Sequence, residues 1–233
     1  MTGTIINVAA ILIGSTIGLL FGARIPERFK DTVIAGMGLF TAVMGIQMFF
    51  KSENQLIVLG AMIIGTLIGE WLGLEDGLQR IGLSLEKRFS RDTESGTGSR
   101  FVRGFMVASL LFCIGPMAIL GSIQDGLTGD FNLLAVKSTL DGFASVAFAS
   151  TLGIGVMFSS VMILIYQGGI SLLAGLLSSI ISDPMMNEMT ATGGVILVGL
   201  GISNLLEIKK IRVGNFLPAL AIAPLIVWIL AKF

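Results

Sequence analysis

Histidine is absent from this chain of 233 residues, and cysteine occurs once, at Cys113. Without histidine there is neither an imidazole metal ligand nor a histidine proton relay. A single thiol can form neither an internal disulfide nor a thiolate zinc site. The sequence therefore predicts no metal site and no cofactor. Nucleophile elbows, phosphate-binding loops and metal-ligand clusters are missing as well, so we do not expect an enzyme.

Charged residues are scarce too. They make up 13% of the chain, against about 25% in a typical soluble domain, and the fifteen basic and fifteen acidic residues cancel. Because a neutral chain has no net field to attract nucleic acid, we expect no nucleic-acid partner. The chain is 54% hydrophobic, with a mean hydropathy of +0.91. This composition predicts an all-α polytopic membrane helix bundle in the lipid bilayer, with residues 1–233 forming a single transmembrane domain.

Eight apolar stretches have roughly the 20 residues that a helix needs to cross about 30 Å of hydrocarbon. Gly153 and Gly155 separate the fifth stretch from the sixth. The first stretch lacks the basic region and the cleavage pattern of a signal peptide, so we expect it to stay in the membrane. The predicted spans are 5–22, 32–50, 55–74, 101–121, 132–152, 156–181, 190–208 and 214–231.

Basic residues cluster in the segments that follow the first, third and seventh spans. With eight spans these segments lie on one side of the membrane, whereas seven spans would scatter them over both sides. By the positive-inside rule that side is the cytoplasm, and both termini lie outside. The clustered residues are Arg24, Arg28, Lys30, Arg80, Lys87, Arg88, Arg91, Arg100, Arg103, Lys209, Lys210 and Arg212.

The one substantial loop covers residues 75–100. From Leu74 to Phe89, apolar residues recur at three- and four-residue steps among basic ones, which predicts an amphipathic helix on the cytoplasmic face. The polar stretch 91–100 follows it. The loop is either a connector anchored at the interface, which is the commoner case for surface loops, or a regulatory surface.

Glycines repeat at four-residue steps in the first and third spans, so each span presents a groove that another helix can approach closely. Tight packing is one interpretation, and a sliding surface in a moving element is the other. A weaker match relates Gly38 and Gly45 to Gly194 and Gly201, and it would make spans six to eight an inverted repeat of spans one to three. The repeating glycines are Gly14, Gly18, Gly22, Gly65, Gly69 and Gly73.

The fifth span carries two charges, Lys137 and Asp141, which lie four residues apart on one helix face. Ser138 and Ser145 extend that face. At 1.5 Å per residue, Asp141 lies about 13–14 Å deep, near the midplane of the bilayer. An unpaired charge is costly there, so Lys137 is the natural partner of Asp141. The pair is either a binding or coupling site or a structural ion pair. We favour the first because intramembrane charges are usually functional.

Other polar or helix-breaking residues accompany this pair. Gly115 and Pro116 predict a kink or break in the fourth span, because proline removes a helix hydrogen bond. Gln124 and Asp125 follow, either at the mouth of a site reached from outside or in a solvated turn. Two amides, Gln167 and Asn204, lie in the sixth and seventh spans and could converge with Asp141, although a single amide more often joins helices.

Segments of the first, fourth and fifth spans resemble the YdfK/YqgA family of bacterial inner-membrane proteins. The resemblance covers essentially the whole chain. It implies an integral protein of the bacterial inner membrane and a transport role without a settled substrate. The similar segments are Gly14–Gly22 with Ala23-Arg24-Ile25-Pro26, Gly115-Pro116 with Gly121-Ser-Ile-Gln-Asp-Gly126, and Lys137-Ser138 with Asp141-Gly142-Phe143-Ala144-Ser145.

Asp141-Gly142-Phe143-Ala144 and Gly115-Pro116 are also similar to span motifs of manganese exporters and lysine exporters. This chain departs from those groups, because it has about eight spans rather than six and lacks a second intramembrane carboxylate at an equivalent depth. A divalent cation needs several hard oxygen ligands, so these departures weaken the case for a manganese site.

Together these features predict a secondary transporter of a small polar solute or ion, with Lys137 and Asp141 in binding or coupling. The first alternative is a channel formed by a homo-oligomer, whose glycine faces would join the copies. The second is a membrane scaffold or signalling protein that carries no flux, with residues 75–100 as its working surface.

Overall fold

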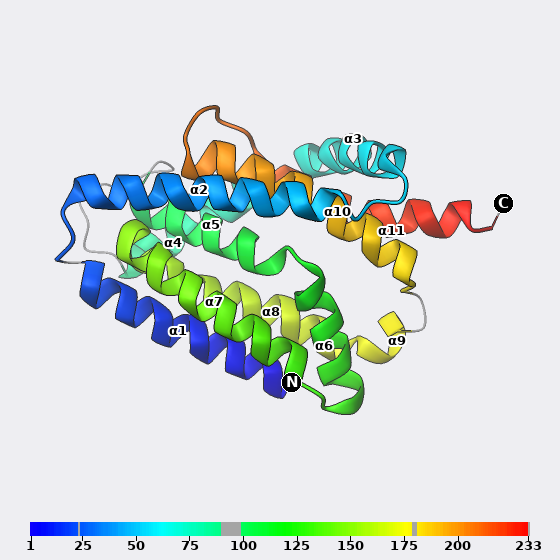
Figure 1. The fold of residues 1–233 in the computed structure, drawn as a ribbon, viewed down its shortest axis with the longest axis horizontal. Helices are drawn as coiled ribbons and strands as arrows, with labels where there is room; N and C mark the ends of the chain where they lie inside the picture. Colours follow the sequence, from blue (N-terminus) through cyan, green and yellow to red (C-terminus); the bar gives the residue numbers. More distant parts are fainter. Residues whose placement is uncertain (23, 90–98, 179–180, 233) are drawn as a thin grey trace. The chain divides into compact units, whose positions relative to one another are not determined.

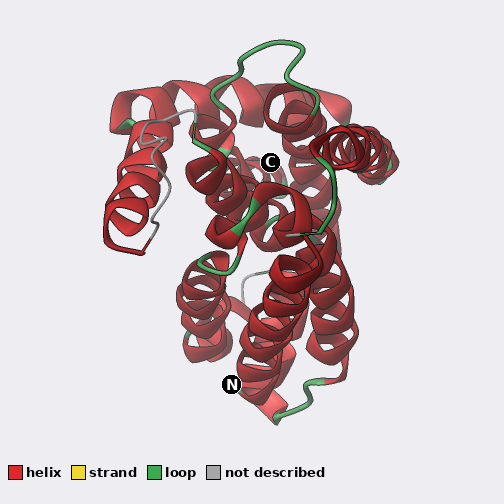
Figure 2. Ribbon diagram, turned by 90° about the vertical axis from the view of Figure 1, so that its left-hand side faces the viewer, coloured by secondary structure: helices red, strands yellow, loops and turns green. Residues whose placement is uncertain are grey.

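A computed structural model describes residues 1–22, 24–89, 99–178 and 181–232. Within these ranges the regular elements are all helical (Figure 2). Seven helices are long and apolar enough to cross a membrane, and a bent pair makes an eighth where the two helices count as one span. The all-α polytopic bundle expected from the sequence is therefore confirmed.

The helices group into two compact units. Unit 1 comprises Met1–Ile34 and Gln79–Ser179, and unit 2 comprises Ala35–Leu78 and Ile180–Phe233. In chain order (Figure 1) the elements are α1 (Thr2–Gly22), α2 (Glu27–Phe49), α3 (Gln55–Leu72), α4 (Leu74–Phe89), α5 (Arg100–Cys113), α6 (Pro116–Thr128), α7 (Asn132–Leu152), η1 (Ile154–Val156), α8 (Ser159–Leu172), α9 (Ala174–Ser178), α10 (Asp183–Leu200), η2 (Gly201–Leu205), η3 (Val213–Phe216) and α11 (Ala219–Leu230).

In unit 1, α1 packs directly against α7 through its glycines (Figure 1). A Cβ atom on Gly14 or Gly18 would overlap the carbonyl oxygen of Gly142 or Val146, respectively, and one on Gly22 would overlap that of Ser150. Contact positions rise together along both helices, so α1 and α7 run parallel. The glycine groove predicted in the first span is thus occupied by α7, and no side chain separates the two backbones. A sliding role for this surface stays a prediction.

In unit 2, α2 packs against α10 through the glycines that suggested an internal repeat. Gly45 lies against Gly194, and Gly38 lies against Gly201, so these two helices run antiparallel. Mutual contact is a sufficient physical reason for the equal spacing of the two glycine pairs. The inverted repeat itself stays a prediction.

The third span uses its glycines differently from the first. Gly65 and Gly69 lie against Ala219 and Asn215, so α3 runs antiparallel to the segment formed by η3 and α11. Gly73 instead ends α3 in the left-handed conformation, with a φ of 62°. The prediction that Gly73 belongs to the packing groove was therefore wrong, because this glycine supplies the helix cap.

The predicted break in the fourth span lies between α5 and α6, which are bent by 64°. Gly115 has a φ of 148°, a conformation that side chains other than that of glycine rarely adopt. Pro116 then begins α6, where the missing N–H would have had no helical partner. The break is thus built from the two residues that the sequence singled out. Motion about it stays a prediction.

The loop after the third span contains the expected helix, α4. Acidic Glu75 and Asp76 lie in its first turn and basic Lys87 and Arg88 in its last, which complements the helix dipole. Its position on the cytoplasmic face stays a prediction, and residues 90–98 of the polar stretch lie outside the described residues.

α10 begins earlier than expected, at Asp183 rather than at residue 190, because its one internal carboxylate has partners. Glu188 is buried and accepts hydrogen bonds from Ser52 Oγ at 2.7 Å, from the Glu53 N–H at 2.8 Å and from the Asn54 N–H at 2.9 Å. These contacts fix the turn between α2 and α3 within unit 2. The charge at 188 therefore belongs inside the helix.

Replacing Glu188 with alanine should destabilise the protein by about 2–4 kcal/mol, because three donors would lose one shared acceptor. The measurement is the thermal unfolding midpoint of the purified protein in detergent. Glu53→Ala is the matched control, since the Glu53 side chain is exposed and accepts one bond, from Asn187. Equal midpoints for the two variants would show that Glu188 does not hold the turn.

Candidate functional site

Four polar residues of α7 lie on its buried face: Lys137, Ser138, Asp141 and Ser145. Lys137 and Asp141 are only 6% and 8% exposed. The Lys137 ammonium donates to Asp141 Oδ2, so the contact inferred from their four-residue spacing is present. The structure thus brings a full charge pair into the interior of unit 1.

Asn7 of α1 connects this pair to α8. The side chain of Asn7 is fully buried, and its Nδ2 donates to Asp141 Oδ2 at 3.0 Å and to Gln167 Oε1 at 3.2 Å. Gln167 is therefore joined to Asp141 through Asn7, as the predicted convergence of amides requires. Asn7, Lys137, Asp141 and Gln167, from α1, α7 and α8, are called the polar network below.

The sequence analysis did not identify Asn7. This residue lies near the start of the predicted span 5–22, where an amide is usually at the membrane surface. One signal could have found it: Asn7 and Ser15 share a helix face, two turns apart. The contact with Asp141 joins residues 134 positions apart, so no local pattern encodes it.

The polar network is incompletely satisfied by the described residues. Two buried atoms of the network, Asn7 Oδ1 and Gln167 Nε2, have no hydrogen-bond partner among them, and neither has Ser145 Oγ on the same face of α7. Nearby on α1, the hydroxyls of Thr4 and Ser15 are in the same state. A buried polar atom without a partner costs about 1–3 kcal/mol, so such atoms normally meet water or a ligand. The free groups mark the network as a candidate binding site.

α5 forms another wall beside the pair. The Lys137 ammonium lies 5.9 Å from the ring centroid of Phe112, within the range of a cation–π contact. Cys113 follows on the same helix, close enough for the charges of Lys137 and Asp141 to act on its thiol. The ammonium thus faces a carboxylate on one side and an aromatic ring on another.

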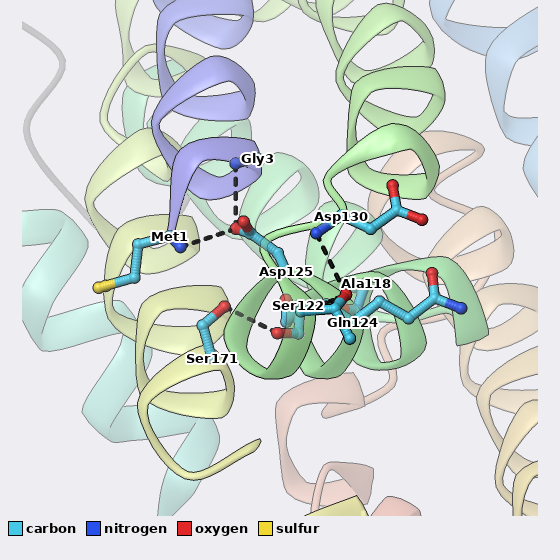
Figure 3. Close-up of polar contacts among 9 residues, drawn as sticks. Met1, Gly3, Ala118, Ser122, Gln124, Asp125, Asp130 and Ser171 are labelled. Atoms are coloured by element: carbon cyan, nitrogen blue, oxygen red, sulfur yellow. Dashed lines mark hydrogen bonds and ion pairs between the residues drawn. The ribbon is translucent and has the colours of Figure 1, made fainter. Parts of the chain in front are cut away.

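Gln124 and Asp125, which follow the break, point in different directions (Figure 3). Asp125 is buried, and its Oδ2 accepts from the Gly3 N–H at 3.0 Å and pairs with the Met1 amino group at 3.1 Å. Gln124 is exposed and points away from Asp125. The interpretation of Asp125 as part of a solvated turn was wrong. The helix α6 continues to Thr128, and the buried Asp125 carboxylate binds the start of α1.

The last predicted amide, Asn204, lies in η2 of unit 2, whereas the polar network belongs to unit 1. The Asn215 amide is likewise engaged within unit 2, where it donates to Glu70 and accepts from the Glu75 N–H at 2.8 Å. Among the described residues, no three histidine, cysteine, aspartate or glutamate side chains gather closely enough to hold a metal ion.

These features define the class of the protein: a polytopic helical membrane protein with a charge pair and two amides buried inside one helical unit. The chain belongs to the family described as "Protein of unknown function (DUF554)", whose model matches residues 2–228. This match, together with the two relatives described next, confirms the resemblance to the YdfK/YqgA family that was drawn from the sequence motifs.

Two relatives extend over almost the whole chain. The "Uncharacterized membrane protein YdfK" of Bacillus subtilis (strain 168) is 32% identical over 237 residues, covering 100% of this chain and 98% of the relative. The "Uncharacterized protein YqgA" of Escherichia coli (strain K12) is 33% identical over 221 residues, covering 95% of this chain and 94% of the relative. No solved structure matches the chain.

Proposed function

We propose that the protein is a secondary transporter, not an enzyme, and that it carries a small polar solute or ion across the bacterial inner membrane. The observation that carries the proposal is the polar network with its unpartnered atoms. A charge pair and two amides inside a membrane bundle are costly, and they are retained where a solute or ion must be bound. Lys137 and Asp141 serve binding or coupling.

The two amides of the network are closed to solvent in this conformation. Asn7 and Gln167 are 0% exposed. A solute therefore reaches the network only after helices of unit 1 move, as alternating access requires. The break at Gly115 and Pro116 is the element of unit 1 best suited to such a movement, because backbone torsions can change there without breaking a continuous helix.

Helix directions within each unit favour eight membrane crossings. α1 and α7 run parallel, which supports an odd number of crossings between them, namely α2, α3 and the bent pair of α5 and α6 counted as one. The antiparallel pairs α2 with α10 and α3 with α11 support the same count. Eight crossings place both termini on one side, which the basic clusters assign to the outside.

This topology predicts the behaviour of reporter fusions. Alkaline phosphatase fused after Lys232 should be active, because the reporter needs an oxidising compartment to form its disulfides. The same reporter inserted after Lys209, between the seventh and eighth spans, should be inactive. Activity measured in intact cells checks both positions, and the opposite pattern would contradict the topology.

The test of transport begins with a thermal-unfolding screen of the detergent-purified protein against cations, amino acids and small organic acids. A solute that binds the native state raises the unfolding midpoint. Each solute that does so is then supplied to proteoliposomes under an ion gradient. Saturable uphill uptake is expected. Fast passive flux would instead indicate the channel, and no binding and no flux of any solute would indicate the scaffold.

A further inference from the structure

The hydrogen bonds of the polar network determine which atoms it leaves free. Asn7 Nδ2 contacts two oxygens, Asp141 Oδ2 and Gln167 Oε1. The Asn7 amide must therefore direct its NH2 group at them, and Gln167 must direct its own NH2 group elsewhere. That NH2 group is fully buried and has no partner among the described residues. The free capacity of Gln167 is thus a donor, which suits a ligand that carries acceptors.

The charge of the site limits what can enter it. Lys137 and Asp141 cancel. Asn7 of α1, which donates to Asp141, and Gln167 of α8, which accepts from Asn7, carry no charge. On the helices packed beside α7, Cys113 of α5 and Tyr166 of α8 are titratable but ordinarily uncharged at neutral pH, and Asp125 of α6 is engaged with the start of α1. A net charge at this depth is costly, so the loaded site must also be neutral.

We propose that the polar network binds a small, singly charged oxyanion, such as a carboxylate, together with one proton. This inference rests on the proposed function and names its substrate class. The oxyanion accepts hydrogen bonds from the Lys137 ammonium and from Gln167 Nε2. The ion pair between Lys137 and Asp141 breaks, and the proton binds the released carboxylate. One anion and one proton enter, so the net charge is zero before and after.

A metal cation fits the same atoms poorly. It would displace the Lys137 ammonium, which would have to lose its proton, and it would need several oxygen ligands. The network offers the Asp141 carboxylate and Asn7 Oδ1, whereas Gln167 presents a donor. The two cases differ in the direction of proton exchange. Binding of the oxyanion takes up a proton, whereas binding of the cation releases one.

The test measures proton exchange by the purified full-length protein in weakly buffered detergent solution with a pH indicator. The probes are L-lactate, methanesulfonate and the neutral lactamide. We expect uptake of about one proton per bound anion, no response to lactamide, and an affinity for methanesulfonate that rises about tenfold for each unit of falling pH. Methanesulfonate stays ionised, so its result excludes binding of an undissociated acid.

Variants test the roles of Lys137 and Asp141 separately. Lys137→Gln should bind neither anion, whereas Lys137→Arg should retain binding, because a guanidinium cannot lose its proton. Adding Asp141→Asn to Lys137→Arg should make anion binding independent of pH. Lys209→Gln, on an exposed connection, is the control and should behave as the unchanged protein.

Two results would overturn the oxyanion inference and leave the transporter proposal standing. One is proton release when sodium replaces choline at constant chloride, without a response to either anion. The other is undiminished lactate binding by Lys137→Gln. Absence of any response to these probes and to the wider solute screen would instead remove the proposed function.

Discussion

Asp141→Asn should abolish solute uptake into proteoliposomes while the protein still folds. The asparagine Oδ1 can still accept the hydrogen bond from Asn7 Nδ2, so the connection between α1 and α7 is preserved. The variant loses the negative charge beside Lys137. Lys137 can then no longer exchange the Asp141 carboxylate for the solute, which is the step that couples binding to movement. Uptake driven by a gradient should fall to the level of empty vesicles, a loss expected to exceed about 100-fold.

The matched control is Asp130→Asn, which makes the same chemical change at an exposed position. Asp130 Oδ1 accepts the Asn132 N–H at 3.0 Å ahead of α7, and an asparagine oxygen can do the same. Size-exclusion profiles establish that both variants are folded. Normal uptake by Asp141→Asn would show that Lys137 and Asp141 form only a structural ion pair, and it would favour the alternative of a membrane scaffold or signalling protein.

Gly18→Leu should have the largest effect on stability. A Cβ atom at Gly18 already overlaps the Val146 carbonyl oxygen, and a leucine side chain would force α1 away from α7. Because the obstacle is backbone on a neighbouring helix, no rotamer relieves it, and we expect a cost of about 3 kcal/mol or more. Separation of the helices would also break the contact between Asn7 and Asp141.

Gly36→Leu serves as the control for Gly18→Leu. Gly36 lies within α2, and a Cβ atom built there meets nothing within 4 Å among the described residues. We expect it to retain the yield and the thermal midpoint of the unchanged protein in detergent. A Gly18→Leu variant that matched Gly36→Leu in both would show that α1 and α7 are not in backbone contact.

The parts of the fold that follow from local pattern could be predicted. Hydropathy placed the spans, the four-residue spacing placed Lys137 beside Asp141, and Pro116 placed the break between α5 and α6. Each of these depends on residues within one or two helical turns. The parts that could not be predicted depend on distant segments: Asn7 reaches Asp141 across 134 positions, and Glu188 reaches the Ser52 hydroxyl across 136.

Two of the wrong expectations, at Asp125 and Glu188, have a common physical origin. Asp125 and Glu188 are carboxylates near the ends of apolar helices, where a sequence pattern favours solvent. Both are buried instead, because free backbone N–H groups near a helix start or in a turn supply partners. Gly73 continued a four-residue repeat, and only its φ of 62° distinguishes a cap from a packing position.

The parallel contact of α1 with α7 also has a consequence for biosynthesis. Asn7 is made 134 residues before Asp141. At about 5–20 residues per second, the ribosome needs about 7–27 s to reach it. During that time the Asn7 amide and the groove formed by Gly14, Gly18 and Gly22 are not yet covered by α7. The earliest-made helix of unit 1 is thus completed only when α7 arrives, and nascent chains that stop before α7 should be the preferred substrates of membrane chaperones and proteases.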